Sequence, residues 1–63
     1  MKSIELGTLT AAQRGRAILI NNGLACTLRR HTGARGCSYT VEVSERDLDR
    51  ALALLRHAGV RPR

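Results

Sequence analysis

The sequence predicts a small two-layer α+β domain in which the elements follow the order βαββα. Two observations support this prediction: short runs of alternating polar and apolar residues, typical of strands, and two longer runs with apolar residues at helical spacing. Two helices on one face of a small sheet favour a ferredoxin-like topology, written βαββα(β) because a fourth strand is expected to be vestigial or absent. The 63 residues are enough for a single domain, spanning 1–63, with a small core.

The first strand and the first helix follow from the N-terminal residues. Ile4 and Leu6 alternate with polar neighbours, which predicts a short strand that ends at the next glycine. Thr10 and Gln13 have the spacing of a capping box, so we expect a helix to begin near Thr10. The sequence Asn-Asn-Gly at 21–23 ends this helix, because glycine readily adopts the left-handed conformation that follows many helices. The helix is expected to bury a stripe that contains Ala11, Ala12, Gly15, Ile18, Leu19 and Asn22.

The second and third strands are expected to form a hairpin. Leu24, Cys26 and Leu28 alternate in the second strand, residues 37–43 alternate throughout, and residues 31–36 are expected to form the loop between them. The register follows from placing the apolar residues of both strands on the core side. The expected pairs are Leu24 with Val43, Cys26 with Val41, Leu28 with Tyr39, Thr27 with Thr40, and Arg30 with Cys37. The other face of the sheet is expected to be polar and hydrated, with Ser3, Glu5, Thr27, Arg29, Ser38, Thr40 and Glu42.

The second helix is expected to follow the third strand directly. Ser44 is predicted to cap it, and Glu45 and Asp47 in its first turn are favourable for the helix dipole. Gly59 is expected to end it, and residues 60–63 are too few to predict a fourth strand. The buried stripe of this helix is expected to contain Leu48, Ala51, Leu52, Leu55 and Ala58.

Basic residues dominate the charge, with a net charge of +6 at pH 7. Segment 14–35 contains five arginines and no acidic residue, enough to attract an anionic partner. Nucleic-acid binding is therefore one alternative function. Single-strand binders stack bases on exposed aromatic rings, however, and the only aromatic residue here, Tyr39, is expected to face the core. A protein-interaction module that pairs through the open edge of the first strand is another alternative, and the same edge predicts a weak homodimer.

Several function classes lack their residue patterns in this sequence. No Ser/His/Asp set, carboxylate pair or phosphate-binding glycine loop is present, so we expect no enzyme in the turnover sense. No cofactor is expected, and the two cysteines and two histidines lack metal-ligand spacing. The sequence has no apolar run of the ~20 residues that span a membrane and no secretory signal pattern. We expect a cytoplasmic protein without membrane partners, whose thiols stay reduced.

Cys37 is the candidate reactive residue. It opens the third strand after Gly36, opposite Arg30 and near Arg35 and His31. Positive neighbours favour the thiolate, which is the nucleophilic form of cysteine, and Gly36 leaves space beside the sulfur. His31 could assist proton transfer, but we expect a solvated loop histidine. A second interpretation, in which Cys37 fills the rim of the core, stays open.

Cys26 is expected to differ from Cys37, because it lies between Leu24 and Leu28 on the core side of its strand. Burial raises a thiol pKa and makes the sulfur inert. In the expected register the two cysteines are roughly 13 Å apart along the strands, too far for a disulfide.

Three segments carry a resemblance to a known family: ILINNGL at the end of the first helix, RGCSYTVEV in the third strand, and SERDLDRALALLRHAGV after it. They resemble a family of small bacterial proteins described as selenium/sulfur carrier-like, formally a domain of unknown function, over residues 4–59. Cys37 matches the cysteine that opens the third strand in this family, whereas Ser38 stands where the family usually has a glycine.

The resemblance implies a carrier of sulfur or selenium. The Cys37 thiolate would accept the atom as a persulfide or selenosulfide and then deliver it to a partner enzyme. Enzymes that transfer sulfur or selenium are the partners that this function implies.

Overall fold

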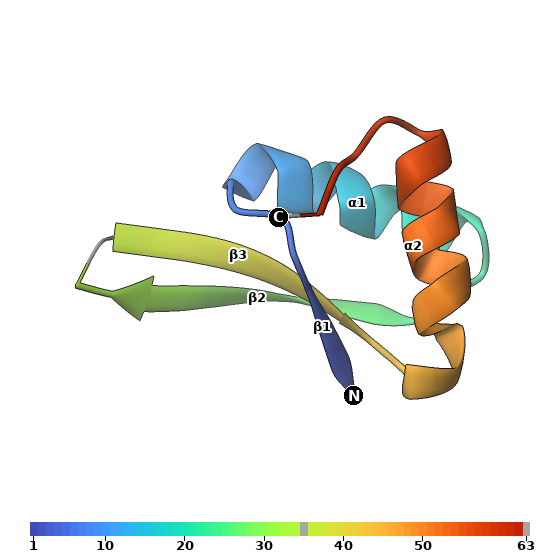
Figure 1. Cartoon of the computed structure of the whole chain (residues 1–63), viewed down its shortest axis with the longest axis horizontal. Helices are drawn as coiled ribbons and strands as arrows, with labels where there is room; N and C mark the ends of the chain where they lie inside the picture. Colours follow the sequence, from blue (N-terminus) through green and yellow to red (C-terminus); the bar gives the residue numbers. More distant parts are fainter. Residues whose placement is uncertain (35, 63) are drawn as a thin grey trace.

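The computed structural model describes residues 1–34 and 36–62 and shows a small α+β fold (Figure 1). Its three strands form one antiparallel sheet in the order β1-β3-β2, and both helices lie on the same face of this sheet (Figure 1). The predicted order βαββα is confirmed, and residues 60–62 form no strand. The elements are β1 (Lys2–Glu5), α1 (Leu9–Asn21), β2 (Cys26–Gly33), β3 (Gly36–Val43), the 3₁₀ turn η1 (Glu45–Asp47) and α2 (Leu48–His57).

Helix α1 begins earlier than the capping-box spacing predicts. Thr8, and not Thr10, is the N-cap, because the Thr8 hydroxyl accepts a hydrogen bond from the Ala11 backbone N–H at 3.1 Å. The helix ends as predicted, with Gly23 at a φ of 80°. Asn22 is exposed and is not part of the buried stripe, since its side-chain amide instead donates to a backbone carbonyl of the last turn, at 2.8 Å.

The hairpin is longer than predicted, and its register is shifted by two residues. Val41 pairs with Leu28 instead of Cys26, and only positions 34 and 35 separate the two strands. Residues 31–33 therefore continue β2, although they were expected to form part of the loop. Gly36 has a φ of 109°, which lets the chain reverse over two residues. A shift of two leaves every side chain on its predicted face, because the side chains of a strand alternate with a period of two.

The second helical segment also begins differently from the prediction. Ser44 forms no side-chain capping bond; its backbone carbonyl accepts from the Asp47 N–H at 2.9 Å and closes the 3₁₀ turn η1. Helix α2 starts only at Leu48, after this turn. Gly59, with a φ of 82°, follows the end of the helix as predicted.

The hydrophobic core fills the space between the sheet and the two helices. Val60 belongs to this core although it lies outside any strand, and its N–H donates to the Leu55 carbonyl at 2.8 Å. Thr40 is the exception to the hydrated face that the sequence predicts, since it is only 6% exposed. The buried apolar residues are Ile4, Leu6, Ala12, Leu19, Leu24, Val41, Val43, Ala51, Leu55 and Val60.

Candidate thiol site at the end of the hairpin

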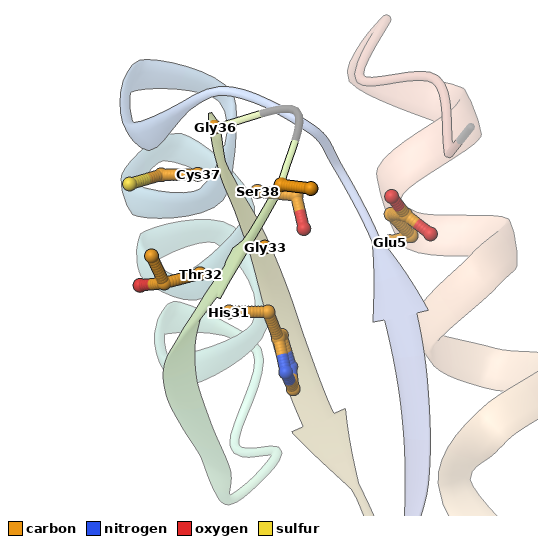
Figure 2. A pocket seen from close by; sticks show the side chains of 8 residues that line it. Glu5, His31, Thr32, Gly33, Gly36, Cys37 and Ser38 are labelled. Carbon is orange, nitrogen blue, oxygen red and sulfur yellow. The ribbon is translucent and has the colours of Figure 1, made fainter.

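Cys37 is exposed near the end of the β2–β3 hairpin. Its strand partner is Thr32, and not Arg30 as the sequence predicts, because of the shifted register. Figure 2 shows the Cys37 and Thr32 side chains pointing to one side of the hairpin, while His31 and Ser38 point to the other. The exposed position means that a partner can reach the sulfur without any opening of the core.

Arg30 contacts Cys37 across a diagonal of the hairpin. Its Nη2 atom donates a hydrogen bond to the Cys37 Sγ at 3.3 Å, although Arg30 is paired with Tyr39. This bond to the sulfur raises the pKa of Arg30, so the guanidinium keeps its charge beside the thiol. A charged guanidinium therefore lies within hydrogen-bond distance of the exposed sulfur.

Gly36 places no side chain next to Cys37 in the sequence. Apart from its two chain neighbours, no heavy atom of the described residues lies within 4 Å of the point that a Cβ on Gly36 would occupy, and the φ of 109° disfavours any side chain there. A reacting group can therefore approach the sulfur past position 36. Arg35, the other expected neighbour from the loop, lies outside the described residues.

His31 is not brought to Cys37, contrary to its expected place in a solvated loop near the sulfur. It belongs to β2 and points to the face opposite Cys37 (Figure 2). There its Nε2 is hydrogen-bonded to the Thr40 hydroxyl at 2.9 Å. Arg30 and Gly36 therefore lie beside the thiol. His31 does not, because neighbouring residues of a strand face opposite sides of the sheet.

Cys26 has a more enclosed environment than Cys37. It is the first residue of β2 and is half-buried, whereas the sequence predicts full burial in mid-strand. Its Sγ donates a weak hydrogen bond to the Arg16 carbonyl at 3.8 Å. Burial raises the pKa of this thiol, and the positive charge of Arg16 opposes the shift without cancelling it. At neutral pH Cys26 is therefore held as the less reactive thiol form.

The shifted register also separates the two cysteines further than expected. Cys37 pairs with Thr32, six residues along β2 from Cys26. At the rise of an antiparallel strand this corresponds to roughly 20 Å, far beyond disulfide reach.

The open face of the sheet contains a polar network that the sequence prediction missed. Arg29 Nε forms a salt bridge with Glu42 Oε1 at 3.1 Å, and the Ser3 hydroxyl donates to the other oxygen of this carboxylate at 3.5 Å. The predicted pairing of Thr27 with Thr40 is absent, since Thr27 lies opposite Glu42. All of these residues had been assigned to the polar face, but only the correct register brings Arg29 and Glu42 together.

The arginines of segment 14–35 have different surroundings. Arg14 donates to the Ala58 carbonyl at 3.1 Å and so caps the end of α2. Arg16 lies near Cys26, Arg29 is paired with Glu42, and Arg30 contacts Cys37. The charges of these four arginines are thus spread over helix α1 and both faces of the hairpin, which disfavours one continuous anion-binding patch.

Among residues 1–34 and 36–62, no group of three or more His, Cys, Asp or Glu side chains is arranged to hold a metal ion. In the same part of the chain, no helix has the length and hydrophobicity needed to cross a membrane.

Comparisons with protein-family models, with curated proteins and with solved structures find no match to this chain.

Proposed function

We propose that the protein carries sulfur or selenium on Cys37 and delivers it to a partner enzyme. The observation that carries the proposal is the hydrogen bond from Arg30 to the exposed Cys37 sulfur, 3.3 Å long. A carrier thiol must be a thiolate, must be accessible to two partners in turn, and must be more reactive than the other thiols of its chain. The exposure of Cys37 and the raised pKa of Cys26 support the second and third requirements, and the charged Arg30 beside the sulfur is the feature on which the proposal relies for the first.

The loading step is a thiol exchange in which no atom is lost. The Cys37 thiolate attacks the outer sulfur of a donor persulfide, a new Sγ–S bond forms, and the donor's S–S bond breaks. The donor leaves as a thiolate, and the transferred sulfur keeps its hydrogen and its oxidation state. In delivery, the thiolate of an acceptor attacks the outer sulfur on Cys37 in the same way. Selenium follows the same route as a selenosulfide, and a reducing compartment such as the cytoplasm keeps the free thiol available.

The shape of the fold suits such a carrier. We interpret the sheet order β1-β3-β2 as a ferredoxin-like arrangement that lacks its fourth strand. The end of the hairpin extends beyond the helices (Figure 1), which presents Cys37 to a partner protein instead of enclosing a substrate. A carrier needs this accessibility more than it needs a deep pocket, and we infer no enzymatic turnover.

The test is persulfide loading followed by intact mass measurement. The wild type and the Cys37→Ser and Cys26→Ser variants are incubated with a cysteine desulfurase and cysteine as the sulfur source. We expect the wild type and Cys26→Ser to gain the mass of one sulfur atom, and Cys37→Ser to gain none. Loading of Cys37→Ser, or failure of the wild type to load while the desulfurase still releases sulfide, would contradict the proposal.

Arg30→Gln is the matched test of the proposed activation. It removes the charge and shortens the side chain, so the contact with the sulfur is lost and loading at neutral pH should slow. Arg56→Gln, at the end of α2, makes the same change of charge elsewhere and should load at the wild-type rate. Equal rates for the two variants would mean that Arg30 does not activate Cys37.

A further inference from the structure

The outer side of β2 is an open sheet edge. The sheet order β1-β3-β2 places β2 at one end, and no strand of the described residues 1–34 and 36–62 pairs with its outer side. This edge is eight residues long, against four for β1 at the other end. Every second residue of an edge strand directs its backbone N–H and C=O outward, so β2 offers about four such residues to a partner strand.

The side chains along this edge carry one sign of charge. Strand β2 contains Arg29, Arg30 and His31 and no acidic residue, and its last five residues are all exposed. Arg29 and Arg30 are neighbours in the strand and so face opposite sides of the sheet. The edge strand therefore carries an arginine on each of its two faces, and both guanidiniums contact residues of β3.

The side chains of Arg29 and Arg30 make different contacts within the protein. Arg29 is paired with Glu42 of β3, yet its side chain remains 60% exposed. Arg30 is exposed, and its hydrogen bond goes to the Cys37 sulfur and not to an acidic side chain. Glu42 offsets the charge of Arg29, but the charge of Arg30 meets no acidic side chain, so the edge keeps a positive charge and favours an anionic partner.

We propose that the edge of β2 is a docking site for an acidic, extended segment of a partner protein, which adds to the sheet as a further strand. Backbone hydrogen bonds would provide the attachment, and glutamates or aspartates opposite Arg29 and Arg30 would provide the selectivity. This binding site shares Arg30 with the thiol site but stands whether or not that thiol carries sulfur.

A second copy of the chain fits this edge less well. Arg29 and Arg30 are in the middle of β2, so symmetric antiparallel pairing of two β2 strands would bring arginines of both copies close together. Like charges opposite each other destabilise a sheet, and charged edge residues are a common device against self-pairing.

The test follows the backbone amides of the isotope-labelled protein by NMR during titration with a defined peptide. The probe is a capped peptide of alternating glutamate and valine with the length of β2, and the control peptide has lysine in place of glutamate. We expect the glutamate peptide to shift and protect the amides of residues 27–33, to leave β1 unaffected, and to lose affinity as salt is added. The lysine peptide should cause no such change.

Variants separate the edge from general charge attraction and from the thiol. Arg30→Gln should weaken binding of the glutamate peptide about threefold, while Arg56→Gln on α2 should not change it. Cys37→Ser should bind the peptide like the wild type. Loss of binding in Cys37→Ser would mean that the peptide is held at the thiol and would overturn the proposal.

Other occupants of the edge would give their own results. Concentration-dependent shifts of residues 27–33 without any peptide would assign the edge to a second copy. A single-stranded oligonucleotide that displaces the peptide at physiological salt would assign it to nucleic acid. Shifts centred on β1 or on the helices, or equal effects of both peptides, would also overturn the proposal.

Discussion

At Gly15, helix α1 lies close to Leu6 and Leu55 in the core. A Cβ atom at this position would lie 2.8 Å from Leu6 Cδ1 and 3.3 Å from Leu55 Cδ2. Leu6 is 3% exposed and Leu55 is fully buried, so neither side chain can swing into solvent to make room. Alanine is favoured over glycine in a helix by about 1 kcal/mol, whereas overpacking a core costs about 1–3 kcal/mol. We therefore expect Gly15→Ala to lower the free energy of unfolding by about 1 kcal/mol.

A double-mutant cycle tests whether Leu6 causes this cost. Leu6→Val removes the δ-methyl group that the new Cβ would meet, so Gly15→Ala in that background should become neutral or stabilising by up to about 1 kcal/mol. Urea unfolding followed by far-UV circular dichroism measures each corner of the cycle. Ala17→Gly, at an exposed position of α1, is the control and should cost about 1 kcal/mol in both backgrounds. Stabilisation of the wild type by Gly15→Ala, or no coupling with Leu6→Val, would refute the packing argument.

Three further outcomes follow from the fold and the site. Thr8→Ala should destabilise the protein by about 1 kcal/mol, while Thr10→Ala should have little effect; urea unfolding compares them, and equal losses would mean that Thr8 is not the cap. Limited alkylation with iodoacetamide at neutral pH, read by peptide mass spectrometry, should label Cys37 faster than Cys26, whose pKa is raised by burial; equal rates would contradict the assignment. Single-stranded nucleic acid should bind weakly and be released by physiological salt in a fluorescence anisotropy assay; submicromolar, sequence-dependent binding at that salt would establish the nucleic-acid alternative.

The elements of this fold were predictable because their patterns have different periods. Alternation in the third strand is typical only of a strand, and the apolar stripe of the second helix is typical only of a helix. Gly23 and Gly59, which have positive φ angles, end the two helices. The start of α1 was not predictable in this way, because Thr8 and Thr10 are both good capping residues two positions apart. In the structure Thr8 is the cap, and Leu6, two residues before it, is buried in the core.

The alternation of polar and apolar residues does not determine the length of the hairpin. The polar residues 31–33 are typical of a loop, and nothing in their own sequence shows that they pair with residues 36–38. The burial pattern sets the face of each residue, but registers that differ by two satisfy it equally well. His31 shows the consequence: counted as a loop residue it could approach the thiol, but as a strand residue next to Arg30 it must face the other way.

The contact between Arg30 and Cys37 is present although the observed register differs from the predicted one by two residues, and the reason is geometric. A shift of two keeps both residues on one face and turns a directly opposite pair into a diagonal one. Diagonal neighbours have their backbones about 7–8 Å apart, against about 5 Å for direct pairs, which long side chains can still span. The guanidinium of Arg30 does so and ends 3.3 Å from the sulfur. A shorter side chain at position 30 would have met the thiol only in the expected register, so the length of the arginine is what makes this site tolerant of hairpin register.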